Sequence, residues 1–267
     1  MLYQIRHRTH YRYTQPLRSA VQTLCLTPRD TDAQRVHHWR LDTPVPTQAQ
    51  TDAWGNRTHV LALGAGARAL LCEATGQVET HGHALHTDPH GPDPRLYRMP
   101  SPLATPDAAL RDAALSAVYG IDPQDAQQQA LALLHRVAER VAYRPGTTDA
   151  RTTAAQVWHG GQGVCQDQAH VLIAACRAAG LPARYVSGYV YAPGAPSLAS
   201  HAWVQVCVDV AARQWLGLDV THGCAVGERH VQLAVGPDYT ACAPVRGVRQ
   251  GGGREQLSVS VEIEPQH

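Results

Sequence analysis

Two amino acids are missing from this chain of 267 residues: it contains no lysine and no phenylalanine. All 23 basic residues are therefore arginines, and with 22 acidic residues they give a formal net charge of +1. A chain this close to neutral has no large basic field with which to hold nucleic acid or an anionic membrane, so we expect neither as a partner. We attribute the missing residue types to a GC-rich coding bias rather than to function.

Long apolar runs are also missing. No stretch approaches the ~18 apolar residues of a membrane span, and the opening segment MLYQIRHRTHYRY lacks the continuous apolar stretch of a signal peptide. The seven cysteines form an odd, scattered set without a CxxC pair. This argues against a disulfide framework or a zinc site and favours a reducing compartment. We therefore expect a cytoplasmic protein.

Residues 1–80 have the pattern of a small β-sandwich. Short segments rich in strand-forming residues recur at 2–13, 24–26, 36–41, 59–63 and 77–80, with proline and Gly55-Asn56 turn signals between them. Residues 81–121 are richer in proline, glycine, histidine and aspartate, and predict a solvated linker. No Cys or carboxylate spacing completes a metal-ligand set around the histidines of this segment, which are His81, His83, His86 and His90.

From residue 122 onward the spacing of apolar residues becomes helical. One helix is expected after Pro123, a short one at 152–158, and a third from Cys165 to just before Gly180, with Pro182 beyond its end. In the third helix, steps of three and four residues from Cys165 give an unbroken apolar stripe. Its other side carries the polar residues Gln166, Asp167, His170 and Arg177. We expect Asp167 and His170 at the helix surface or behind the site rather than in catalysis.

Strands are expected again at 183–191, 201–210 and 215–221, the last two forming a hairpin. The tail 256–264 alternates apolar and polar residues, and we predict that this strand returns to the β domain, where it finds both a sheet edge and a core. The predicted organisation is a β-sandwich at 1–80, a linker at 81–121, a core at 122–250 and the returning strand within 251–267.

Three residues of the core have the chemistry of a nucleophilic site. Cys165 opens a helix after glycines, with no Ser, Thr, Asp or Asn directly before it, so unpaired N–H groups and the helix dipole favour a thiolate there. His201 opens a strand and can act as base, and Asp219 on the next strand can orient its imidazole. With an even pairing register, both side chains lie on one face of the sheet. Each residue alone is more often structural, but the three together indicate a catalytic triad.

The segments that carry these residues resemble bacterial transglutaminase-like proteins: GVCQDQAHVLIAACRAAGLPARYVSGYVY, SHAWVQV and WLGLDVTHG. The same family has segments similar to VAYRPGTT and RHVQLAVGPDYTACAPVRG. Its N-terminal β domain is similar to the strand-rich first 80 residues of this chain, which include DAWGN. The resemblance implies an α+β fold with a papain-like core, in which helices pack on an antiparallel sheet, beside an N-terminal β-sandwich. It also implies that Cys165 is the nucleophile, with His201 and Asp219 completing the triad.

The chain departs from the family pattern at four positions, none of them in the triad. The family usually has phenylalanine, proline, asparagine and arginine where this chain has Gln168, Val220, His222 and Pro237. We expect these departures to affect substrate preference, and Gln168 to lie at the edge of the core near the pocket. Tyr143 and Gln162 are candidate side-chain donors to an oxyanion.

The predicted activity is thiolate attack on a carboxamide or peptide bond of a peptide or protein, followed by transfer of the acyl group to an amine or to water. No cofactor or metal is expected. Hydrolysis and transamidation share the same triad, so both stay open, as does the oligomeric state. One alternative is a non-catalytic protein-binding module with an inherited fold, against which an intact triad argues. A metal protein that uses the histidine-rich linker is a weaker one.

Overall fold

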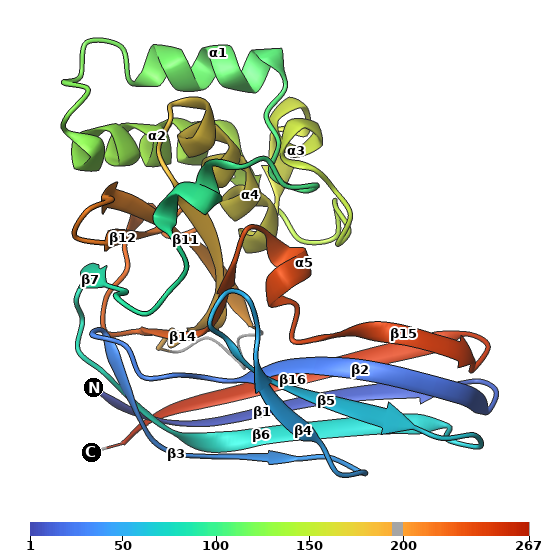
Figure 1. Ribbon diagram of the computed structural model, residues 1–267. Coiled ribbons are helices and arrows are strands. Elements are labelled where there is room, and N and C mark those ends of the chain that lie inside the picture. The colour runs from blue at the N-terminus through green and yellow to red at the C-terminus, as the bar shows by residue number, and fades with distance from the viewer. Residues whose placement is uncertain (194–199, 267) are drawn as a thin grey trace.

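The computed structural model describes residues 1–193 and 200–266 (Figure 1). The strand β1 (Leu2–Tyr13) lies inside a four-stranded antiparallel sheet. The order of this sheet is β16-β1-β6-β3, and a second sheet with the order β15-β2-β5-β4 packs on it. The strands that join β1 in the two sheets are β2 (Leu17–Thr27), β3 (Gln34–Asp42), β4 (Gln48–Thr51), β5 (Arg57–Leu63), β6 (Ala69–Thr80), β15 (Val245–Gly251) and β16 (Glu255–Gln266).

Alternating apolar residues of both sheets form the core of this sandwich. Tyr3 and Ile5 of β1 are fully buried together with Leu24 of β2 and Leu61 of β5. The strand predicted in the tail is β16, and it pairs with β1 along the whole length of both strands. Because β15 pairs with β2, the chain returns to the sandwich already at residue 245, earlier than the expected end of the core at residue 250.

The second part has helices packed on one side of a six-stranded sheet with the order β13-β12-β11-β10-β14, in which β7 pairs with β12 (Figure 1). Its strands are β7 (Leu85–Thr87), β10 (Ala183–Val190), β11 (His201–Asp209), β12 (Gln214–Asp219), β13 (Cys224–Ala225) and β14 (His230–Gly236). Its helices are η1 (Pro94–Arg98), α1 (Ala108–Ala117), α2 (Ala126–Arg140), α3 (Ala154–Gly160), α4 (Cys165–Ala178) and α5 (Tyr239–Cys242). Two short strands, β8 (Ala142–Tyr143) and β9 (Gln162–Gly163), pair in parallel. Within the described residues, no helix combines the length and the apolar composition needed to cross a membrane.

The segment 81–121, expected to be a solvated linker, instead contains β7, η1 and α1. A buried arginine explains this difference. Arg177 of α4 donates to the carbonyl of Tyr97 at 2.8 Å, to the carbonyl of Pro237 at 2.7 Å and to the hydroxyl of Ser101 at 3.0 Å. These bonds hold η1 and the residues after it against α4. Of the polar side of α4, Asp167, His170 and Arg177 are buried. Asp167 and His170 were expected either at the helix surface or behind the site, and they are not at the surface.

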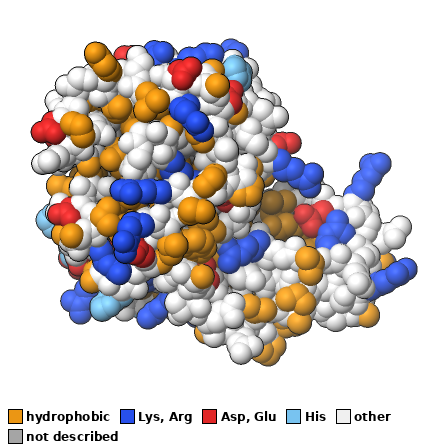
Figure 2. All heavy atoms as spheres, turned by 45° about the horizontal axis from the view of Figure 1, so that its top comes forward, with side chains coloured by type: hydrophobic (Ala, Val, Ile, Leu, Met, Phe, Trp, Pro, Cys, Tyr) orange, Lys and Arg blue, Asp and Glu red, His pale blue; other side chains and the backbone are white. Residues whose placement is uncertain are grey.

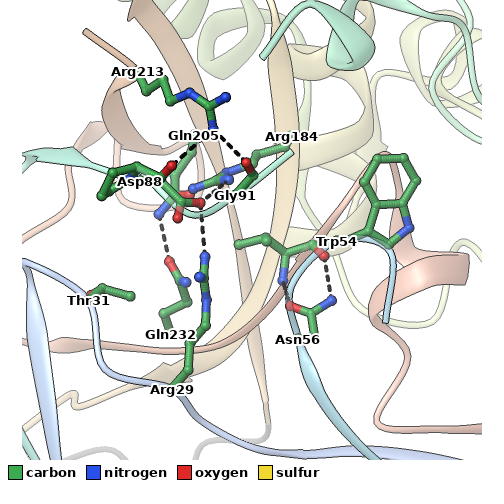
Figure 3. A network of polar contacts seen from close by, with 12 residues as sticks. Arg29, Thr31, Trp54, Asn56, Asp88, Gly91, Arg184, Gln205, Arg213 and Gln232 are labelled. Atoms are coloured by element: carbon green, nitrogen blue, oxygen red, sulfur yellow. Dashed lines mark hydrogen bonds and ion pairs between the residues drawn. The ribbon is translucent and has the colours of Figure 1, made fainter. Parts of the chain in front are cut away.

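Buried polar contacts join the sandwich to the second part (Figure 3). Asp88 Oδ2 accepts hydrogen bonds from Arg29 after β2, at 2.9 Å, and from Arg184 of β10, at 2.7 Å. Asn56 bonds in both directions with the backbone of Val235 in β14, each bond being 2.8 Å long. Directional bonds of this kind fix the orientation of the two parts, which matters because the candidate site lies between them.

Candidate active site

The start of α4 presents Cys165 in the way the sequence suggests. The preceding Val164 has no side-chain acceptor, but Asp167 Oδ2 accepts the Val164 backbone N–H at 2.8 Å and the Thr148 hydroxyl at 2.6 Å. A Cβ at Gly163 would lie 2.7 Å from Asp167, so a larger residue there would displace this carboxylate. Among the described residues, no acceptor bonds the backbone N–H of Cys165. The helix start is thus held in place while a donor beside the thiol stays available.

His201 and Asp219 lie on one face of the sheet, in the diagonal arrangement that an even register gives. Strand β11 pairs with β12 so that Gln205 faces Gly217, which places Trp203 opposite Asp219 and His201 one diagonal step away. His201 Nε2 donates to Asp219 Oδ2 at 2.8 Å. Both side chains are buried, Asp219 completely.

The charges of this pair follow from its contacts. Burial by itself raises the pKa of Asp219, but hydrogen bonds from His201, His230 and His222 outweigh it and hold the pKa of the carboxyl well below its usual range. Burial lowers the pKa of His201, whereas its hydrogen bond with Asp219 and the nearby Cys165 side chain, together with the charges of both, raise this pKa to about 9. At neutral pH the site therefore favours an imidazolium between a carboxylate and the thiol.

Two further histidines contact Asp219. His222 Nδ1 lies 2.6 Å and His230 Nε2 lies 3.0 Å from the same Oδ2 atom that His201 contacts, and the His222 backbone N–H donates to Oδ1 at 3.2 Å. Sequence reasoning noted His222 only as a departure from the family pattern and missed His230. His230 opens β14, a strand that was not predicted, so no local pattern indicated that it would reach Asp219.

Cys165 and His201 open onto a cleft of about 330 Å³ between the two parts of the molecule. One wall comes from the second part, including Tyr143 of β8. The opposite wall comes from the sandwich and contains Tyr11 of β1 with residues of β15 and β16. Figure 2 shows a hollow with hydrophobic side chains at the place where the narrower strand-rich part projects from the body.

Other residues considered from the sequence lie elsewhere. Gln168, expected near the pocket, is buried and does not line the cleft; it donates to the Val141 carbonyl at 2.9 Å and accepts from the Thr221 hydroxyl at 2.7 Å. It thereby connects α4 to the turn after Asp219. Gln162 bonds with Arg144 and also lies outside the cleft lining. Of the linker histidines, His86 is buried and the other three are exposed.

We predict that Cys165 is alkylated faster than any other cysteine of the folded protein. Burial raises the pKa of most other thiols, those of Cys25, Cys72 and Cys207 to about 11 and that of Cys176 to about 12. Iodoacetamide labelling at neutral pH, with each peptide quantified by mass spectrometry, measures the order of reaction.

The matched control for this labelling is Cys224, which is exposed whereas Cys165 is half-buried. Simple accessibility would make Cys224 react first. Faster labelling of Cys224 than of Cys165 would show that the nucleophile has been assigned to the wrong residue.

Comparison with known proteins identifies both parts. The transglutaminase-like superfamily matches residues 116–220, and the bacterial transglutaminase-like N-terminal region matches residues 3–79. An uncharacterized protein of Mycobacterium tuberculosis is 31% identical over 98% of this chain and 92% of its own length. An uncharacterized protein of Mycobacterium leprae is 28% identical over 96% of each chain.

A solved structure has the same fold throughout. This protein from Cytophaga hutchinsonii, described as a "putative cysteine protease", superposes with a TM-score of 0.80 over 99% of this chain and 90% of that chain, at 22% sequence identity. The core has the papain-like α+β fold of thiol-dependent catalysis, and the strand-rich part is a bacterial transglutaminase-like N-terminal region. The chain therefore belongs to the transglutaminase-like superfamily.

Proposed function

We propose that this protein is a cysteine-dependent enzyme that forms a thioester between Cys165 and an acyl group taken from a carboxamide or peptide bond. One observation carries the proposal. The imidazole of His201 bonds with Asp219 at 2.8 Å, and His201 and Cys165 line the same cleft where it reaches the start of α4. A thiol, a base and a carboxylate that orients the base are the parts that this chemistry needs.

The steps follow from these contacts. The Cys165 thiolate attacks the carbonyl carbon, a C–S bond forms, and the oxygen takes up negative charge. The backbone N–H of Cys165 is available to donate a hydrogen bond to this oxygen. The hydroxyl of Tyr143 is a second candidate donor, because this half-exposed side chain lines the cleft. The C–N bond then breaks while His201 gives its proton to the leaving amine. Water or another amine attacks the thioester, His201 takes the incoming proton, and the acid or new amide leaves.

The two-sided cleft supports a peptide or protein substrate with an apolar group near the reacting bond. Leu257 and Val259 of β16 line the cleft, and each is about half exposed to solvent. Because the chain has no lysine, its only primary amine is its terminal one. The acceptor in an acyl transfer would therefore have to come from another molecule, or be water.

The test is to trap the acyl-enzyme. The protein is incubated with a library of glutamine-containing peptides, quenched in acid and analysed by intact mass and peptide mapping. We expect a mass increase on the peptide that contains Cys165, its absence in Cys165→Ala, and its retention in the matched variant Cys224→Ala. Adding a small primary amine then separates transfer from hydrolysis by the product that forms. If peptides bind equally to the natural chain and to Cys165→Ala and no acylation occurs, the protein is a binding module instead.

A further inference from the structure

Asp219 Oδ2 has more hydrogen-bond donors around it than one oxygen atom can bond well. Three imidazole nitrogens lie 2.6–3.0 Å from it, those of His201, His222 and His230. A carboxylate oxygen has two lone pairs. Among the described residues, the other oxygen, Oδ1, receives only the backbone N–H of His222, at 3.2 Å. Donors are thus crowded on one oxygen while its partner is nearly free, an arrangement that orientation of His201 alone does not require.

The same atoms have the composition and the spacing of a metal site. The nitrogens of the three histidines and the carboxylate oxygen all lie within 4.8 Å of one another. Imidazole nitrogen and carboxylate oxygen are ligands of zinc, which takes them at about 2.0–2.1 Å in tetrahedral geometry, so that ligand atoms are about 3.3 Å apart. Side-chain shifts of about 1 Å would bring the cluster to that spacing.

Hydrogen bonds decide which histidines can offer a lone pair. His230 Nδ1 accepts the backbone N–H of Gly227 at 3.2 Å, so its proton is on Nε2 and is donated to Asp219. His201 can carry its proton on the ring nitrogen that faces Cys165. His222 can carry its proton on Nε2, because its side chain is 46% exposed. These two rings lie close together, with centroids 5.3 Å apart.

We propose that a divalent transition-metal ion of the zinc type binds His201 Nε2, His222 Nδ1 and Asp219 Oδ2, and that it reversibly blocks the thiol site. The inhibitory part of this proposal rests on the function proposed above. His230 does not ligate the ion; its N–H to Asp219 holds the carboxylate in position, as outer hydrogen bonds do in metal sites. A fourth position remains for water, and the exposed side of His222 gives the ion a route from solvent.

Blocking follows from what the ion displaces. When the ion enters, the His201 imidazolium gives its Nε2 proton to solvent, and His222 carries its proton on Nε2. The lone pairs of His201 Nε2, His222 Nδ1 and Asp219 Oδ2 then bind the metal. His201 then loses the carboxylate that orients it and the freedom to exchange protons with a leaving group. The thiol chemistry stops until the ion is removed, and the cluster acts as a metal-sensitive brake on the site.

Binding is tested without reference to activity. Zinc is titrated against a chromophoric chelator in a Cys165→Ala/Cys224→Ser background, which removes the thiol next to His201 and the exposed thiol opposite Asp219. We expect one zinc ion per chain. His222→Asn should weaken this binding by about 100-fold or more, because losing even an outer-shell partner of a metal site costs 10–100-fold. The matched variant His135→Asn removes an exposed histidine on α2 and should change nothing.

Thermal melting of each variant shows whether it folds, and His222→Gln replaces His222→Asn if the latter does not. Equal zinc affinity with and without His222, or no zinc binding at all, would overturn the proposal. Asp219 would then be surrounded by a hydrogen-bonding network only.

Inhibition is measured on the chain with its natural cysteines, as the rate of Cys165 acylation in zinc relative to the same sample in chelator. We expect zinc to stop acylation and chelator to restore it. In His222→Asn the inhibitory zinc concentration should rise by the same factor as the dissociation constant. If the inhibitory zinc concentration is the same in His222→Asn as in the natural chain, zinc does not inhibit through this site and the inhibitory part of the proposal is wrong. A chain that binds zinc through His222 but never acylates Cys165 would refute the proposed function and leave the metal site standing.

Discussion

The variant His201→Ala is expected to lose nearly all acylation of Cys165, at least about four decades in rate, because the thiol loses both its base and its charge partner. Asp219→Asn should cost roughly two to four decades, since an amide no longer selects the tautomer of His201 that serves Cys165. The Asp219 carboxylate contacts His201 directly at 2.8 Å, so the two residues should act as a unit.

The double variant His201→Ala/Asp219→Asn measures this unit. It should be little slower than His201→Ala alone, because an orienting carboxylate has no role once the imidazole is gone. The measurement is a double-mutant cycle on the acylation rate, made in chelator, with circular dichroism to verify folding. If the two losses multiply, or if Asp219→Asn keeps full activity, Asp219 is a structural carboxylate and the triad assignment is wrong.

A second large effect is expected in acid, where the protein should lose most of its stability between pH 6.5 and pH 4. Burial lowers the pKa of His7, His86 and His170 to about 4, whereas an unfolded chain has a histidine pKa of about 6.5. Above pH 6.5 these residues are neutral in both states and do not affect stability. As the pH falls below 6.5 the unfolded chain binds protons that the folded chain does not, so unfolding becomes more favourable.

The size of this effect follows from the pKa differences. Each histidine should lower the free energy of unfolding by about 3 kcal/mol by pH 4, and the three together by about 9 kcal/mol, against a total of about 5–15 kcal/mol for a folded domain. Urea unfolding at a series of pH values, with chelator present, gives the slope.

His86→Leu should flatten this slope by about a third and raise stability at every pH, because neither nitrogen of this buried ring has a hydrogen-bond partner within residues 1–193 and 200–266. The matched variant His135→Gln replaces an exposed histidine and should leave the slope unchanged. A stability that stays flat from pH 7 to pH 5 would contradict the lowered pKa values.

Local pattern predicted much of this molecule because the elements that carry the site are locally encoded. The helix that begins at Cys165 has a 3.6-residue apolar stripe and ends where Gly180 and Pro182 stop it. The hairpin of β11 and β12 alternates with period two, so its parity allowed His201 and Asp219 to share one face if the register was even, and the pairing of the two strands supplies that register. The returning strand β16 was predicted because an alternating segment needs a sheet.

Features that depend on contacts between distant segments were not predicted. Periodicity measures only the polarity of a side chain, so it could not decide whether the polar side of α4 faces solvent or is buried. Arg177 is buried because the carbonyls of Tyr97 and Pro237, far from it in the sequence, provide acceptors for its guanidinium. The contact of His230 with Asp219 likewise needs β14 in its place in the sheet, and no local signal gives that place, whereas His222 lies only three residues after Asp219.

The pairing of β16 with β1 has a consequence for the order in which the protein is made. During synthesis Cys165, His201 and Asp219 leave the ribosome before residues 245–266, which supply β15, β16 and part of the cleft wall. Until those residues emerge, one edge of β1 has no partner, and unpaired strand edges invite aggregation. The three residues of the triad are therefore synthesised before the cleft around them can form. The sandwich wall of the cleft is complete only when β16, the last strand of the described chain, pairs with β1, the first.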